Sequence, residues 1–312
     1  MSLDPVVLFF VLGLAAGLMR AEMRLPPAIY EFLSVILLLA IGLKGGIELS
    51  KQSFGDLLPD IAAVITMGFA LPLLAFPILR YIGRFKKVDA ASVAAHYGSV
   101  SVGTYAVATT YLAAQHIPFE AYMPLFLVIL EVPAILVGIV LVRGISKETH
   151  WRRLSHEVFL GKSIVLLLGG LFIGWAAGED GIAPIAGLFF DPFKGVLALF
   201  LLEMGLIAAS QVGSLRRYGL FLLGFGVLFP ILSACIGSGL GYILGLSVGG
   251  TVLLATLAAS ASYIAVPAAM RIALPKANPT LSLTGSLGIT FPFNIIFGIP
   301  LYHKITQYLY GA

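Results

Sequence analysis

The chain has 312 residues, of which 59% are hydrophobic and only 11% are charged, and its mean hydropathy is +1.02. Charged residues make up about a quarter of soluble domains, because a water-exposed surface needs them. The composition therefore excludes a soluble enzyme, a disordered chain and a nucleic-acid-binding protein. It indicates an integral membrane protein with a small net charge of +4.

Ten apolar segments are long enough to cross a bilayer as helices, which takes about 20 residues each. In chain order they lie near residues 5–20, 28–50, 57–83, 88–115, 120–143, 160–178, 192–211, 217–246, 249–273 and 281–309. The first resembles a signal-peptide core, but Asp4 stands where a basic residue is expected, so we retain it as a span. The sequence predicts an all-α membrane protein with ten transmembrane helices.

The basic residues are unevenly distributed between the two sides that these spans define. All but four of the 19 fall near the loops after spans 1, 3, 5, 7 and 9, and the four exceptions are Lys44, Lys51, Lys194 and Lys304. Basic loops stay in the cytoplasm. We therefore expect a plasma (inner) membrane protein with both termini outside.

The two halves of the chain resemble each other. Four matched pairs occur in the same order, at offsets of 158 to 163 residues: Gly42 and Gly205, Pro72 and Pro230, Ser99 and Ser260, and Pro133 and Pro292. With five spans per half, the second half enters the membrane from the opposite side, which predicts the inverted repeat typical of secondary transporters. We expect repeats at 1–143 and 161–312, joined by a cytoplasmic linker at 144–160.

Spans 4 and 9, the fourth members of the two repeats, are predicted to be broken by the glycines, serines and proline of residues 98–104 and 259–267. Irregular backbone at membrane depth persists only where protein or a watery cavity satisfies it. Two half-helix N-termini meeting there would bind a small anion. The predicted substrate-binding residues are Gly98, Ser99, Ser101, Thr104, Ser260, Ser262 and Tyr263. The alternative is that these serines bond to carbonyls of their own helices or hold helices together.

Glu131 lies in the middle of span 5, where a charged group is costly and therefore commonly functional. Its repeat counterpart is Thr290, and Asn294 follows one turn later. An oxygen-rich set of this kind suits Na⁺. The predicted sodium ligands are Glu131, Ser101, Ser262, Thr290 and Asn294; the alternative for Glu131 is a structural hydrogen bond. We expect no organic cofactor.

An enzyme is the rival class, because His96 precedes Ser99 and Ser101 and could activate a nucleophile. However, Ser101 does not form a G-x-S-x-G elbow, because Ser99 occupies the first glycine position, and the sequence contains no H-E-x-x-H motif or phosphate-binding glycine loop. An intramembrane hydrolase also has no need of an inverted repeat. We therefore predict a carrier; a passive anion channel is a further alternative, which saturable flux would exclude.

The chain resembles the cyanobacterial sodium-dependent bicarbonate transporter family (SbtA-like) over essentially all ten spans. The segments that carry this resemblance are 42–46, 98–104, 131–134, 258–260 and 275–279. It implies a homotrimer in which a core domain (spans 3–5 and 8–10) moves against a scaffold, or gate, domain (spans 1, 2, 6 and 7). It also implies that bicarbonate and Na⁺ bind where spans 4 and 9 cross, and that a cytoplasmic PII-like protein is a partner.

Five departures from that family's pattern concern its carboxylates and hydroxyls. Tyr263 stands in place of a carboxylate, Ala261, Ala265 and Gly103 stand in place of hydroxyl residues, and Glu131 replaces an aspartate. One buried carboxylate neutralises about one monovalent cation. The hypothesis is therefore elevator-like, sodium-dependent bicarbonate uptake with at most one Na⁺ per anion. The alternative carrier is proton-coupled or sodium-independent and takes another small carboxylate or inorganic anion.

Overall fold

The computed structural model describes residues 4–21, 23, 25–51, 54–144, 156 and 159–311, and these residues form helices and connections without a strand. The helices before the linker are α1 (Pro5–Leu18), α2 (Pro27–Leu49), α3 (Phe54–Pro77), its π-helical extension η1 (Ile78–Ile82), α4 (Lys87–Gly98), α5 (Val102–Ala114), α6 (Met123–Glu131) and α7 (Pro133–Arg143). Those after it are α9 (Lys162–Phe189), α10 (Phe193–Ile243), α11 (Val248–Ala259), α12 (Ala265–Ala273), α13 (Pro279–Leu283), η2 (Thr284–Thr290), α14 (Phe291–Phe293), η3 (Asn294–Gly298) and α15 (Ile299–Tyr310).

Seven helical stretches of the described residues are long and apolar enough to cross a membrane. They are Pro27–Leu49, Leu57–Ile82, Met123–Arg143, Lys162–Phe189, Phe193–Ser214, Tyr218–Ile243 and Pro279–Tyr310. The other three predicted spans correspond to the 14-residue α1 and to two interrupted helices, α4–α5 and α11–α12. The all-helical membrane protein is confirmed, whereas the count of ten transmembrane helices stays a prediction.

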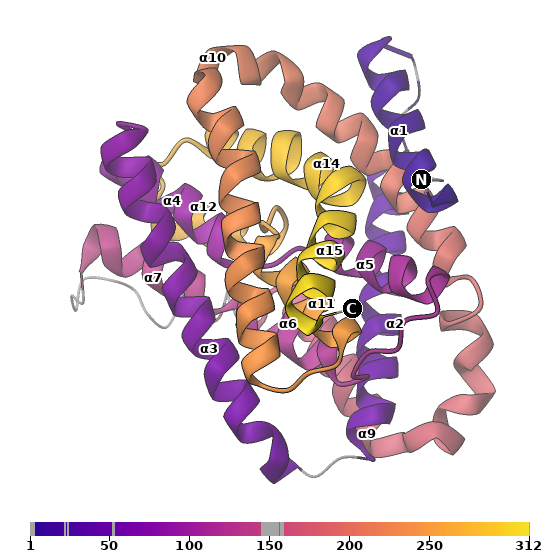
Figure 1. The fold of residues 1–312 in the computed structure, drawn as a ribbon. Helices are drawn as coiled ribbons and strands as arrows, with labels where there is room; N and C mark the ends of the chain where they lie inside the picture. The colour runs from indigo at the N-terminus through magenta and orange to yellow at the C-terminus, as the bar shows by residue number, and fades with distance from the viewer. Residues whose placement is uncertain are drawn as a thin grey trace.

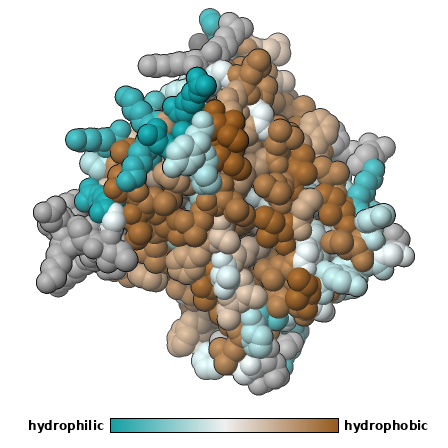
Figure 2. Space-filling view, turned by 60° about the vertical axis from the view of Figure 1, so that its left-hand side comes forward, coloured by the Kyte–Doolittle hydropathy of each residue, from teal (hydrophilic) through white to brown (hydrophobic). Residues whose placement is uncertain are grey.

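The surface is hydrophobic where lipid would contact it. Figure 2 shows a broad hydrophobic area across the middle of one face, with hydrophilic residues gathered towards its edges. Large apolar side chains such as Phe172, Leu220 and Leu228 are exposed. A soluble monomer rarely exposes apolar area on this scale, which is typical of a membrane-facing surface.

Two long helices change direction at a glycine. Gly178 in α9 has φ 65°, and Gly219 in α10 has φ 76°. Backbone in this left-handed region favours glycine, because a Cβ would clash with the chain. The bend at Gly219 falls near the start of the predicted span 8, and α10 comprises two apolar stretches, Phe193–Ser214 and Tyr218–Ile243, joined without a loop.

Two helix crossings are built from small residues spaced four apart. The α2–α9 crossing uses Gly42, Gly46, Gly170 and Gly174, and the α1–α10 crossing uses Gly13, Gly17, Gly205 and Ala209. A Cβ at Gly46 would collide with the Leu171 carbonyl, and one at Gly205 with the Phe10 carbonyl. Such small-xxx-small pairs let membrane helices approach closely. These crossings join α1, α2, α9 and the first segment of α10, and Figure 1 shows α1, α2 and α9 on one side of the molecule.

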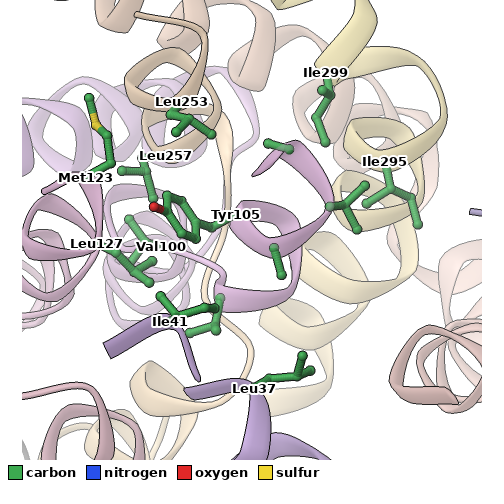
Figure 3. Close-up of a cluster of buried hydrophobic side chains, with 14 of the residues drawn as sticks. Leu37, Ile41, Val100, Tyr105, Met123, Leu127, Leu253, Leu257, Ile295 and Ile299 are labelled. Atoms are coloured by element: carbon green, nitrogen blue, oxygen red, sulfur yellow. The ribbon is translucent and has the colours of Figure 1, made fainter. Parts of the chain in front are cut away.

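Helix α5 lies among helices from both halves of the chain. Its apolar residues pack in the largest hydrophobic cluster against side chains from α2, α6, α11 and α15, as Figure 3 shows. Tyr105 lies at the centre of that view, near Leu127 of α6 and Leu257 of α11. This packing fixes the N-terminus of α5, where the first predicted interruption lies.

Candidate functional site

The first interruption lies where the sequence predicts it. The chain leaves α4 at Gly98, is extended at Ser99 and Ser101, and enters α5 at Val102. Gly98 permits a close approach, because a Cβ there would lie 2.5 Å from the Pro72 ring. Ser101 is the N-cap of α5.

The Ser101 hydroxyl organises the start of α5. Its oxygen accepts hydrogen bonds from the Thr104 amide at 3.1 Å and from the Thr104 hydroxyl at 2.9 Å. N-cap serines stabilise helix starts by satisfying amides that have no partner within the helix. The Ser99 hydroxyl contacts the Glu131 carbonyl at 3.5 Å. These bonds hold the first half of the site against α6.

The second interruption also lies at the predicted place. The chain leaves α11 at Ala259, is extended at Ser260, and enters α12 at Ala265. The Ser260 hydroxyl donates to the Leu257 carbonyl at 2.8 Å, as the local alternative for these serines predicts. The Ser262 hydroxyl instead accepts a bond from the Val266 amide at 3.3 Å.

The two interruptions touch each other through buried polar groups. The Ser101 amide donates to the Ser260 hydroxyl at 3.0 Å, and the Ser101 hydroxyl donates to the Tyr263 hydroxyl at 3.2 Å. The Ser262 amide donates to the His96 carbonyl at 2.8 Å. Segments about 160 residues apart in the sequence thus form one polar crossing inside an apolar bundle.

A cavity of about 10 Å³ lies at this crossing. It is lined by Val100, Ser101, Val102, Glu131, Ser163, Ser262, Tyr263, Ile264 and Ala265. A cavity of this size accommodates about one water molecule. The described conformation therefore has room for a single water-sized species, and not for a polyatomic anion.

Glu131 is the only carboxylate among the lining residues. It is 2% exposed, and within the described part of the chain its Oε2 atom has no hydrogen-bond partner. A buried ionised carboxylate without a partner is costly. A carboxylate oxygen beside two serine hydroxyls is a suitable donor set for a hard cation. The residues present therefore fit a small monovalent cation such as Na⁺. Among the described residues no cluster of three His, Cys, Asp or Glu suggests a metal ion of another class.

Two predicted sodium ligands lie elsewhere in the bundle. The Thr290 hydroxyl bonds to the Gly226 carbonyl at 2.7 Å and to the Tyr97 hydroxyl at 2.8 Å. Asn294 donates to the Ala259 carbonyl at 2.9 Å and accepts from the Tyr302 hydroxyl at 2.6 Å. Neither residue lines the cavity, and Asn294 instead supports the end of α11. Of the predicted anion residues, Gly98, Ser99, Thr104 and Ser260 also lie beside the cavity and not in its wall.

Tyr263 covers the N-terminus of α5. A Cβ on Gly103 would lie 2.5 Å from the Tyr263 hydroxyl, so the tyrosine occupies the space that a side chain at residue 103 would need. The ring packs edge-on against Phe291, with centroids 5.3 Å apart. Two of the departures from the family pattern are therefore adjacent and complementary in shape.

Ser163 is a lining residue that the sequence analysis missed. It lies in the first turn of α9, is 4% exposed, and reaches the cavity from outside the two interrupted helices. A lone serine beside a polar linker carries no distinguishing sequence signal. The linker itself, residues 144–160, falls largely outside the described residues.

A family model described as the Na⁺-dependent bicarbonate transporter superfamily matches residues 5–307 of the chain. No curated protein matches the chain. The match covers both interruptions, Glu131 and all the helices that position them.

Proposed function

The chain belongs to the Na⁺-dependent bicarbonate transporter superfamily and is a multi-pass membrane transporter and not an enzyme; from this premise we propose that it takes up bicarbonate with at most one Na⁺. The observation that carries the proposal is the crossing of the two interrupted helices at a cavity lined by one carboxylate and several hydroxyls. The family match supports the class of transport, and the crossing supports the proposal that one anion and one cation bind there.

The anion would bind to the two helix starts. The N-termini of α5 and α12 both lie at the cavity, and a helix N-terminus attracts negative charge. Each contributes only about 0.3–1 kcal/mol, or up to about 2 kcal/mol when partly buried. Micromolar affinity needs about 8 kcal/mol. The hydroxyls of Ser101 and Ser262 and the bound cation would therefore contribute the larger part.

Na⁺ would bind to side-chain oxygens of Glu131, Ser101 and Ser262. These three residues line the cavity, and the cation would neutralise a carboxylate whose Oε2 atom has no partner in the described part of the chain. Bound Na⁺ would also stabilise the anion electrostatically. Because Glu131 is the one lining carboxylate, a second cation would have no compensating charge.

Anion binding requires the site to widen. The cavity of about 10 Å³ accommodates one water-sized species, and Tyr263 covers the start of α5. We propose that α5 and α12 separate around Tyr263 when the anion enters. This widening would accompany an elevator-like movement of a core domain, comprising spans 3–5 and 8–10, against the scaffold.

The contacts between helices support a 5+5 inverted repeat of residues 1–143 and 161–312. In an inverted repeat, α2 corresponds to the first segment of α10, and α1 corresponds to α9. The α2–α9 crossing therefore corresponds to the α1–α10 crossing, and both crossings use small residues four apart. The α3–α4 contact likewise corresponds to the contact of α10 with α11. Ten spans, a homotrimer, external termini and a PII-like partner belong to the same proposal.

The test is uptake of radiolabelled bicarbonate by the purified protein in liposomes, with and without an inward sodium gradient. We expect saturable uptake that the gradient drives. Saturable but sodium-independent uptake would favour the alternative carrier, whereas flux that never saturates would favour a channel.

A further inference from the structure

A second and larger cavity, of about 280 Å³, lies at the end of the molecule where α2 and α9 finish and α10 begins. Its walls come from α2, α5, α6 and the corner between α9 and α10. It is therefore formed jointly by helices of the predicted scaffold and of the predicted core.

The charged side chains lining this cavity are both lysines, Lys44 from α2 and Lys194 from α10. Neither has an ion-pair partner within the described part of the chain. They are also two of only four basic residues on the side predicted to be external. The remaining lining is mainly apolar and includes Tyr105, Thr109 and Phe119.

The surroundings of the cavity are acidic. Acidic residues near this end include Glu48, Glu120, Glu179, Asp180 and Asp191. The neighbouring lysine, Lys51, is already paired with Glu179 at 3.0 Å and Glu48 at 3.1 Å, and these hydrogen bonds raise the pKa of its ammonium group. The Glu120 carboxylate accepts two bonds from Ser247. The charged groups in the cavity wall are thus the two lysines, whereas these carboxylates lie outside the wall.

Helix α5 connects this cavity with the crossing. Tyr105 lines the cavity wall and lies four residues after Ser101, which is about 6 Å along an α-helix. Figure 3 shows Tyr105 directed into the cluster towards Leu257; Ile41 of the same cluster lines the same cavity. An anion at the base of the cavity would be about one helical turn from the start of α5.

We propose that this cavity is an entry vestibule in which Lys44 and Lys194 capture the transported oxyanion before it reaches the crossing. A cleft with walls of low dielectric constant and one sign of charge concentrates ions of the opposite sign. The vestibule explains why an otherwise acidic end retains two unpaired lysines in one hollow. The inference rests on the proposed anion transport for its cargo, but its electrostatics can be measured without transport.

The first experiment measures the potential in the cavity. Ala113, an exposed residue of the cavity lining, is replaced by cysteine (Ala113→Cys) in a Cys235→Ala background. The new thiol is then reacted at low ionic strength with negatively and with positively charged methanethiosulfonate reagents. We expect the negative reagent to be favoured, and the ratio of rates to fall about threefold or more after Lys44→Gln with Lys194→Gln. Ser50→Cys, outside the cavity at the same end, is the matched control. A ratio that the lysine substitutions leave unchanged overturns the proposal; Thr109→Cys repeats the test if Ala113→Cys does not fold.

The second experiment separates a transported anion from an anionic lipid headgroup, which presents the same oxyanion chemistry. Uptake is measured in vesicles of phosphatidylcholine alone and with phosphatidylglycerol added. We expect Lys44→Gln with Lys194→Gln to raise the KM about threefold or more in both, with kcat retained and the effect lost in high salt. Lys51→Gln and Lys304→Gln should leave the KM unchanged. A lysine effect confined to vesicles with phosphatidylglycerol would overturn the vestibule in favour of a lipid site.

Discussion

The two interrupted helices have the same backbone design but different side-chain chemistry. At the first, Ser101 caps α5 and binds the amide and hydroxyl of Thr104. At the second, Ile264 precedes α12 and forms no side-chain cap, while Tyr263 reaches across to the first. The break itself recurs at corresponding positions of the two halves, whereas only at α5 does the N-cap residue bond to its own helix through its side chain. The anion site is therefore expected to be asymmetric.

The two interruptions are also supported differently. The first interruption contacts α6: the Ser99 hydroxyl lies against the Glu131 carbonyl, and the Glu131 carboxylate lines the cavity. At the second interruption, the Asn294 side chain donates to the Ala259 carbonyl, the last of α11, and accepts a hydrogen bond from the Tyr302 hydroxyl. The charge that a cation would need is thus on the first side of the crossing only.

The largest effect is expected from removing that charge. Glu131→Gln keeps the side-chain oxygen but loses the negative charge, so it should abolish whatever sodium dependence the transporter has. Uptake over a range of sodium concentrations measures this, with Glu203→Gln as the control. Glu203 is also buried, but its carboxylate accepts the Leu25 amide at 3.2 Å, away from the cavity.

Two outcomes would contradict this argument. One is full sodium dependence in Glu131→Gln. The other is a wild-type Hill coefficient for sodium clearly near two, because a second cation would then bind without a second lining carboxylate.

The next largest effect is expected from adding a side chain at Gly103, where Tyr263 contacts α5. In Gly103→Ala the new Cβ would lie 2.5 Å from the Tyr263 hydroxyl. Overpacking of this kind typically costs about 1–3 kcal/mol. We expect a lower thermal unfolding temperature and reduced uptake, both partly restored when Tyr263→Phe removes the hydroxyl.

Gly169→Ala is the matched control, because nothing lies within 4 Å of a Cβ at that glycine. It should leave unfolding and uptake unchanged. Equal stability of the two alanine variants would show that Tyr263 does not occupy the space beside residue 103 in the membrane.

The third effect compares one hydroxyl from each interruption. Ser101→Ala removes a cavity hydroxyl and the cap of α5, whereas Ser262→Ala removes a cavity hydroxyl that accepts only the Val266 amide. Loss of a hydroxyl that faces the anion costs about 1–3 kcal/mol, and loss of a cap about 1 kcal/mol more in stability. We expect both variants to bind bicarbonate several-fold more weakly, with the larger loss in Ser101→Ala. Unchanged uptake kinetics in both would favour purely local hydrogen bonding of these serines.

The sequence predicts the interruptions well because their signals are local. Gly98 and Ser101 in one segment, and Ser260 with Pro267 in the other, disfavour continuous helix whatever surrounds them. The contact of Tyr263 with Gly103 depends instead on how segments about 160 residues apart cross, which no local pattern encodes. The same holds for Ser163, which reaches the cavity from a third helix.

Matching positions between the two repeats locates both interruptions, but the residues that it selects in the last span do not line the cavity. Counting from Glu131 predicts Thr290 and Asn294 as site residues, but η2 and η3 make this span π-helical at both residues. A π-helical turn adds a residue to the turn and rotates the side chains that follow. The corresponding helices α6 and α7 are α-helical. Residues at corresponding positions of the two repeats therefore do not both present their side chains to the cavity.

The smallest effect on transport is expected at Thr290. Thr290→Val keeps the shape of the side chain but removes its bonds to the Gly226 carbonyl and the Tyr97 hydroxyl. Each lost bond typically costs about 0.5–1.5 kcal/mol, so the unfolding temperature should fall. The sodium concentration for half-maximal uptake should stay the same, because this hydroxyl does not line the cavity. A clear rise in that concentration, with stability retained, would instead make Thr290 a sodium ligand and would place part of the cation site on the second half of the crossing.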